Sequence, residues 1–148
     1  MDAIKLLKTD HKLVKELLAQ LEETGERATK KRTDLLRKIQ VNLKAHTTIE
    51  EEIFYPAVRA ANVEEGEDMV DEAIVEHASA KDLIKQLQEM QPDDELYDAK
   101  VKVLSEQIEH HVKEEEKEMF PKARKAGLDL LALGQEMAMR KQELMSTL

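Results

Sequence analysis

Residues 46–56 read HTTIEEEIFYP, and residues 111–121 read HVKEEEKEMFP. In both stretches a glutamate follows the histidine by four residues, and a proline follows it by ten. A spacing of four residues places two side chains on one face of an α-helix. Each stretch therefore predicts a helix that carries a histidine and a glutamate on one face, and the repetition indicates a duplicated unit.

The same face continues through four segments of the chain. Apolar, histidine and glutamate residues recur in steps of three and four, which predicts four amphipathic helices directed at a common axis. The stripes are Ile4, Leu7, His11, Val14, Leu18 and Leu21; Leu36, Ile39, Leu43, His46, Glu50 and Ile53; Val70, Ala73, His77, Ala80, Ile84 and Leu87; and Val101, Leu104, Ile108, His111 and Glu115.

Short polar breaks separate these segments, and short connections favour antiparallel neighbours. We expect an all-α fold: an up-down-up-down antiparallel four-helix bundle over about residues 2–126 and a short fifth helix over about 128–147, in one domain. Asp2 is a candidate N-cap, and Pro56 should kink or end the second helix. The other breaks are Thr24-Gly25, 62–66, 91–94, and Pro121 with Gly127, while Leu130, Leu131 and Leu133 give the fifth helix an apolar face.

The composition agrees with a helical domain. The 148 residues are 41% hydrophobic and 37% charged but only 3% aromatic, with four Gly and three Pro. Such a chain is apolar enough to fold, yet poor in the turn and strand residues of an all-β protein. A net charge of -9 argues against binding nucleic acid or an anionic membrane.

The chain contains no cysteine, which excludes disulfides, thiolate nucleophiles and thiolate metal sites. The N-terminal residues lack an apolar signal core, and no stretch is apolar for long enough to span a bilayer. We therefore expect a soluble cytoplasmic protein, and the sequence leaves its oligomeric state open.

Four of the five histidines fall on the inward stripes, and two of them have an inward glutamate four residues later. A buried carboxylate is costly unless it is paired or neutralised. Imidazole and carboxylate groups together are typical ligands of divalent iron, manganese and zinc. The candidate metal ligands are His11, His46, Glu50, His77, His111 and Glu115.

These motifs, together with Asp10-His11 and Glu76-His77, resemble the hemerythrin or HHE cation-binding family over about residues 1–126. The resemblance implies a centre of two non-heme iron ions inside the bundle. It makes the four inward histidines terminal ligands. It makes Glu50 and Glu115 bridging carboxylates, beside an oxo or hydroxo bridge.

One position departs from the oxygen-carrying members of that family. They place a further histidine one turn before the third-helix ligand, where this chain has Ala73. The four-histidine, two-glutamate set looks more like bacterial hemerythrin-like proteins, including the di-iron proteins of iron–sulfur repair. Two octahedral ions need about twelve donor positions, so about two stay exchangeable, and we expect a reactive centre rather than an oxygen store.

The leading functional hypothesis is a di-iron protein that binds or reacts with dioxygen, peroxide or nitric oxide, in binding, sensing or detoxification. An oxidoreductase activity toward peroxide or nitric oxide is one form of it. The alternative is iron storage or delivery related to iron–sulfur centre repair, and a third interpretation is a structural bundle with packed histidines. Manganese or zinc would suit the same ligands.

Four further residues have open roles. His110 points about 100° away from its neighbour around the helix, so it is either solvated or a substitute for the ligand missing at Ala73. Glu51 and Glu116 are either outer acceptors for ligand histidines or direct ligands. Tyr55 is a candidate for a redox or proton-donor role only if Pro56 alters the helix, because on an unbroken helix it lies roughly opposite His46.

Overall fold

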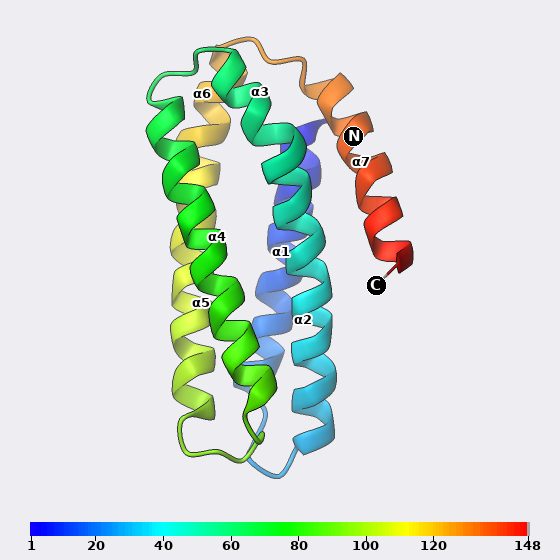
Figure 1. The fold of residues 1–148 in the computed structure, drawn as a ribbon, viewed down its shortest axis with the longest axis vertical. Coiled ribbons are helices and arrows are strands. Elements are labelled where there is room, and N and C mark those ends of the chain that lie inside the picture. Colours follow the sequence, from blue (N-terminus) through cyan, green and yellow to red (C-terminus); the bar gives the residue numbers. More distant parts are fainter. Residues whose placement is uncertain (148) are drawn as a thin grey trace.

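The computed structural model describes residues 1–147, and this range is helical and contains no strand. Four long helical segments run antiparallel and are joined at alternate ends by short connections (Figure 1). They are α1 (Ala3–Glu22); α2 (Thr29–Ile49), extended by η1 (Glu50–Phe54) and α3 (Tyr55–Ala60); α4 (Gly66–Glu89); and α5 (Tyr97–Glu114), extended by η2 (Glu115–Met119) and α6 (Phe120–Lys125). The predicted four-helix bundle is confirmed.

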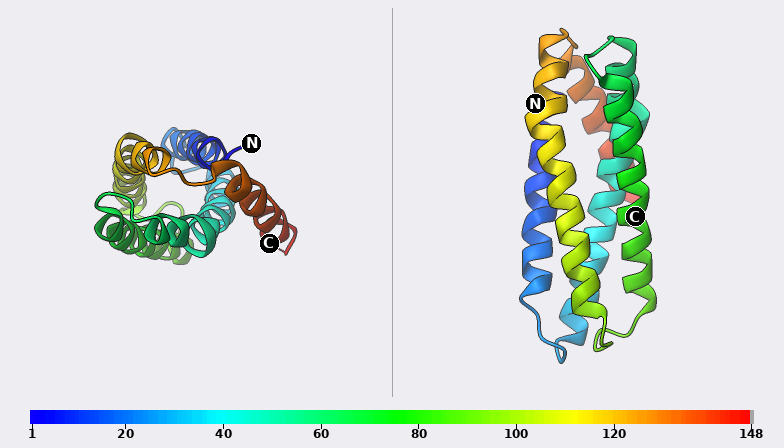
Figure 2. Two further views of the ribbon diagram at one scale, coloured as in Figure 1. Left: turned by 90° about the horizontal axis from the view of Figure 1, so that it is seen from above. Right: turned by 90° about the vertical axis from the view of Figure 1, so that its left-hand side faces the viewer.

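A fifth helix, α7 (Leu130–Thr147), lies outside the four-helix arrangement next to the N-terminus (Figure 2). With 18 residues it is shorter than α1, α4 and the two extended segments, which confirms the expected shorter fifth helix. None of the described helices is both long and apolar enough to cross a membrane.

The helix ends mostly follow the predicted breaks. The Asp2 side chain accepts a hydrogen bond of 2.8 Å from the Lys5 backbone N–H, which makes it the N-cap of α1. Pro121 does not end the fourth segment, which continues through it from the π-turn η2 into α6. Gly127, at φ +81°, follows the end of that segment.

Each repeated sequence stretch contains a π-turn directly before its proline. In η1 and η2 the backbone N–H groups of Tyr55 and Phe120 bond to carbonyls five residues back, at Glu50 and Glu115. The disturbance expected at Pro56 is therefore confirmed, although the helix continues. The wider turn changes which side chains face inward, and Phe54 and Tyr55 are buried.

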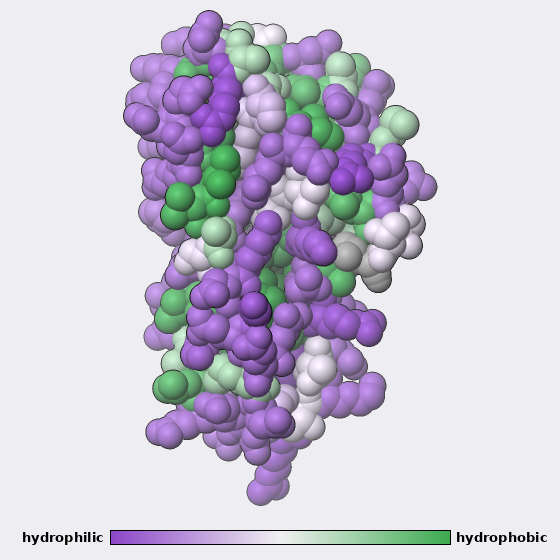
Figure 3. Space-filling model, viewed as in Figure 1, coloured by the Kyte–Doolittle hydropathy of each residue, from purple (hydrophilic) through white to green (hydrophobic). Residues whose placement is uncertain are grey.

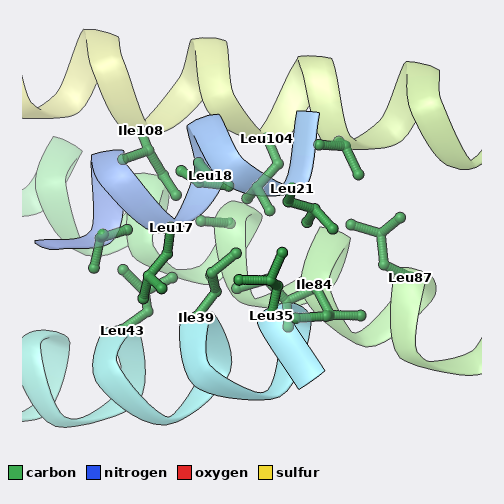
Figure 4. Close-up of a cluster of buried hydrophobic side chains, with 14 of the residues drawn as sticks. Leu17, Leu18, Leu21, Leu35, Ile39, Leu43, Ile84, Leu87, Leu104 and Ile108 are labelled. Carbon is green, nitrogen blue, oxygen red and sulfur yellow. The ribbon is translucent and has the colours of Figure 1, made fainter. Parts of the chain in front are cut away.

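Two apolar clusters fill the bundle. One lies toward the α1–α2 and α4–α5 connections and consists mainly of leucine and isoleucine from α1, α2, α4 and α5 (Figure 4). The other lies at the opposite end and includes Phe54, Phe120 and Met137 of α7. Every stripe residue predicted to point inward is buried except Ile53, which the π-turn leaves half-buried.

One buried cation closes the leucine-rich end. Arg32 is 1% exposed and donates to the Thr24 side chain and carbonyl, to the Pro92 carbonyl and to the Asp98 carboxylate. Its guanidinium lies 4.9 Å from the centre of the Tyr97 ring. A single side chain therefore links the α1–α2 connection to the α4–α5 connection.

Helix α7 packs against α1, α2 and η1. A Cβ added at Gly134 would lie 2.3 Å from the Met1 carbonyl oxygen, so only glycine permits this approach of the two backbones. Met137 is fully buried, whereas Leu131 is 58% exposed, so the prediction that Leu131 contributes to the apolar face was wrong. The visible surface is mostly hydrophilic, with apolar residues in scattered patches (Figure 3).

Candidate metal centre

The structure brings the six predicted ligands together in one layer between the apolar clusters. They come from α1, α2, η1, α4, α5 and η2, and each is 0–9% exposed. Atoms of His11, His46, Glu50 and Glu115 lie within 4.8 Å of one another, and so do atoms of Glu50, His77 and His111.

The imidazole Nε2 atoms converge on the two carboxylates. Glu50 Oε1 lies 3.0 Å from His46 Nε2 and 3.2 Å from His77 Nε2. Glu115 Oε1 lies 2.9 Å from His11 Nε2 and 3.4 Å from His111 Nε2. Each glutamate therefore touches histidines of both hairpins, as two central carboxylates between two ions would.

Each histidine is also held from behind by a carboxylate of another helix. The Nδ1 atoms lie 2.7–2.9 Å from carboxylate oxygens. The pairs are His11 with Glu116, His46 with Asp10, His77 with Glu51, and His111 with Glu76. A carboxylate accepts the Nδ1 proton, which fixes the ring and leaves Nε2 free to bind a cation. Glu51 and Glu116 thus have the outer role that the sequence left open.

The centre contains polar atoms that the protein does not satisfy. His46 Nε2 and both carboxylate oxygens of Glu50 are buried and form no hydrogen bond of acceptable geometry with the described residues, although His46 Nε2 and Glu50 Oε1 lie 3.0 Å apart. Leaving a buried polar group unpaired costs about 1–3 kcal/mol, and a charged group costs more. A cation at this position would satisfy all three atoms, so the residues present fit a metal centre.

The negative field of the centre is strong. Burial opposes protonation of His46 and His111, but neighbouring carboxylates outweigh it and raise the pKa of His46 to about 10 and that of His111 to about 11. Despite burial, His111 and the other groups that bond to Glu115 hold its pKa well below the ordinary value. Such a field favours positive charge, whether it is carried by protons or by metal ions.

Tyr55 lies inside the centre, because the π-turn turns it inward. Its hydroxyl donates to Glu115 Oε2 at 2.5 Å and lies 3.3 Å from His77 Nε2. Burial and the nearby carboxylates raise the Tyr55 pKa well above its ordinary value, so the hydroxyl keeps its proton. The sequence suggested this position only through the proline that follows.

His110 lies outside the centre. His110 is 63% exposed and lies 2.9 Å from Glu114, so it does not replace the ligand missing at Ala73. Ala73 itself is buried at 3% exposure on the predicted inward face.

A small cavity adjoins the histidines on the side of the leucine-rich cluster. Its volume is about 30 Å³, and Val14, Leu43, Ala80 and Ile108 form its apolar wall. On the opposite side of the centre, Phe120 stacks on His11 with ring centres 5.9 Å apart, and Phe54 packs edge-on against Phe120. Along the bundle axis, the candidate ligands therefore lie between apolar side chains on both sides.

Comparison with known proteins supports the same interpretation. The family model of the hemerythrin HHE cation binding domain matches residues 2–123. A crystal structure of an HHE cation binding domain-containing protein from Mycobacterium kansasii superimposes with a TM-score of 0.84 at 25% identity, covering 99% of this chain and 89% of that one. A DNA nickase from Nostoc sp. is 28% identical over 120 residues, and the chain spans about a third of that relative's length.

Proposed function

The chain belongs to the hemerythrin HHE cation-binding family, and from this premise we propose that it is a di-iron protein whose centre binds or reacts with dioxygen, peroxide or nitric oxide. The observation that carries the proposal is the set of orphaned atoms on His46 and Glu50 in a layer of four histidines and two glutamates. These six side chains, His11, His46, Glu50, His77, His111 and Glu115, would hold the two ions.

When bound, the ions supply a change of oxidation state and exchangeable coordination positions. The protein's own residues prepare the centre for this. The outer carboxylates keep the Nδ1 protons in place, so that each Nε2 faces the centre. Phe54 and Phe120 keep water out on one side. The Tyr55 hydroxyl holds a proton beside Glu115 and His77.

The cavity supports a small ligand. At about 30 Å³ it exceeds the roughly 10–15 Å³ that one water molecule needs, and Val14, Leu43, Ala80 and Ile108 form its aliphatic side. A diatomic molecule or peroxide fits such a space, whereas a larger organic substrate does not. This is why we favour oxygen, peroxide or nitric oxide over an organic substrate.

The direct test combines metal analysis with optical spectroscopy. Purified protein is reconstituted anaerobically with ferrous iron, its bound iron is counted, and the spectrum is followed as oxygen, peroxide and nitric oxide are added separately. We expect two irons per chain and charge-transfer bands that respond to at least one ligand. A chain that binds no iron after reconstitution, or whose iron spectrum responds to none of the three, contradicts the proposal.

The alternative of iron storage or delivery is favoured by one surface feature. A cleft lined by Glu72, Glu76 and Glu114 leads from the surface to His111 and Glu115. Acidic walls attract cations to a buried site and let them leave by the same path. Complete loss of iron to a chelator within minutes, without any reaction with the three small ligands, would favour delivery.

A further inference from the structure

The outer carboxylates of the two hairpins are built differently. Asp10 and Glu76 occupy matching positions, each directly before a site histidine, and they accept from Nδ1 of His46 and His111 respectively. The Asp10 side chain is 6% exposed, whereas that of Glu76 is 22% exposed. Asp10 is therefore a buried anion, and its counterpart is reached by water.

A lysine from the fifth helix provides the charge that Asp10 needs. Lys141 of α7 donates a short hydrogen bond to Asp10 Oδ1, while Asp10 Oδ2 holds His46. No lysine or arginine among the described residues pairs with Glu76, which contacts only histidines: His111 at 2.7 Å and His110 at 3.7 Å. The chain Lys141–Asp10–His46 thus has no counterpart in the second hairpin.

The position of Lys141 is fixed by the packing of α7. Gly134 allows the backbone of α7 to approach Met1, and Met137 is fully buried in the adjoining apolar cluster. Arg140 makes a two-pronged ion pair with Glu52 at 2.8 and 3.1 Å. The backbone approach at Gly134 and the buried Met137 keep Lys141 beside Asp10 although the two residues are 131 positions apart, whereas the Arg140–Glu52 pair lies on the exposed face of α7.

We infer that Lys141 is a positioning residue of the metal centre, which acts through Asp10 to hold the His46 ring with Nε2 toward the centre. The inference rests on the proposed function. It makes α7, which lies outside residues 2–123 matched by the family model, a working part of the site. It also makes the ion bound through His46 depend on a fifth helix, while the ion bound through His77 and His111 does not.

The physical reason is that a histidine binds a cation well only when its ring is held in the correct orientation. Loss of such an outer partner lowers metal affinity by about 10–100-fold. Asp10 can provide this hold only while it stays in place, and a buried carboxylate without a paired cation is costly to keep there. Lys141 supplies the cation from a helix that is otherwise peripheral.

The test measures release of ferrous iron from anaerobically loaded protein to a coloured chelator. Wild type, Lys141→Met, Lys141→Arg and Arg140→Met are compared, with thermal unfolding recorded for each. In Lys141→Met we expect one iron per chain to leave about 10-fold faster than in wild type while the other keeps the wild-type rate. Lys141→Arg, which keeps the charge, should restore slow release.

Arg140→Met is the matched control. It removes a cation from the neighbouring position of α7 and breaks the pair with Glu52, but this cation does not reach the centre. If α7 only stabilises the fold, both methionine variants lower the unfolding temperature and release iron alike. That result overturns the inference, and so does wild-type release from Lys141→Met.

The variant Asp10→Asn tests whether Lys141 acts on His46 through Asp10. Asparagine can still accept from His46 but carries no charge for Lys141, so adding Lys141→Met to Asp10→Asn should change the release rate little. A full additional effect in the double variant overturns the route through Asp10. Failure of the proposed function is distinguishable, because wild type itself would then not hold two irons.

Discussion

The two helical hairpins, residues 3–60 and 66–125, follow the same course but treat their central carboxylates differently. Glu115 accepts the hydroxyl proton of Tyr55, whereas no hydroxyl among the described residues donates a hydrogen bond to Glu50, which is approached by imidazole groups. At the position that matches Tyr55, the second hairpin has Phe120, which has no hydroxyl and stacks on His11. One oxygen atom thus separates two otherwise equivalent positions.

The difference shows how a duplicated backbone can build an unequal site. The repeated histidine, glutamate, π-turn and proline determine where the ligand candidates lie in both halves. The surrounding residues differ between the hairpins. Tyr55 of the first hairpin corresponds to Phe120 of the second, and Asp10, which pairs with Lys141, corresponds to Glu76. The experiments below either remove this difference or isolate it, in order of decreasing expected effect.

Glu50→Ala should have the largest effect, because Glu50 approaches histidines of both hairpins. We expect metal content to fall from two ions per chain toward none, as counted by elemental analysis after reconstitution. Glu52→Ala, two residues along and 45% exposed, is the control and should keep full metal content. Equal metal content in Glu50→Ala and wild type would contradict the bridging role.

His77→Ala should weaken the binding of one ion more than that of the other. It removes a ligand candidate of the second hairpin, so one ion should be lost or weakened while the other remains, which titration with ferrous iron would show as one tight site per chain. His110→Ala, at an exposed histidine of the same hairpin, should leave both sites unchanged. Loss of both ions in His77→Ala would mean that the two ions do not bind independently.

Arg32→Met should weaken the connection between the hairpins at the end away from the metal centre. It deletes four hydrogen bonds of a buried guanidinium, so we expect the free energy of unfolding to fall by about 3 kcal/mol. Urea denaturation measures this. Metal content at low temperature should remain as in wild type, and a loss of metal would show that the two ends are coupled.

The metal-free protein should become less stable as the pH rises. The folded pKa values of His46 and His111, about 10 and about 11, exceed the ordinary value of 6.5. Their stabilisation is therefore complete below about pH 6.5 and is lost as the pH rises through the folded values. Each histidine changes the free energy of unfolding by roughly 1.4 kcal/mol per pH unit in between.

Urea denaturation of metal-free protein at pH 6, 8 and 9.5 tests this dependence. Metal binding should show the opposite trend, since ions replace those protons and therefore bind more tightly at higher pH. Stability that rises between pH 6 and pH 9.5 in metal-free protein would mean that the histidines are not held protonated by the carboxylates.

Tyr55→Phe should have the smallest effect and makes the two hairpins more alike. It removes a hydrogen bond to the Glu115 carboxylate, so the metal-free protein should lose about 1.5 kcal/mol of stability. Tyr97→Phe is the control, because the buried Tyr97 hydroxyl has no hydrogen-bond partner among the described residues. Equal losses in both variants would show that the Glu115 contact contributes nothing.

The periodicity of the sequence was sufficient to predict the bundle and the meeting point of the six ligand candidates. Local spacing decides which side chains share a helix face, and the repeat places the corresponding residues of the two hairpins at the same level along the bundle axis. The prediction failed where the backbone left the α-helical period. The π-turn turned Ile53 partly outward and Tyr55 inward, and only the following proline hinted at it.

Contacts between distant segments could not be predicted in this way. Asp10 and Glu76 were visible as neighbours of histidines, but which imidazole each would hold depends on how the helices pack. Lys141 gave no sequence signal at all, because it lies on a helix whose position against α1 depends on Gly134 and Met137. Pairing across 131 residues is a property of the tertiary structure.

The link between α3 and α4, residues 61–65, has a wider consequence. Two identical hairpins associating as a symmetric dimer would carry every substitution twice, once on each side of the axis. Joined in one polypeptide, they can change independently, so a tyrosine can arise opposite a phenylalanine and a fifth helix can serve one side alone. Covalent fusion thus permits division of labour between two halves that began from the same sequence pattern.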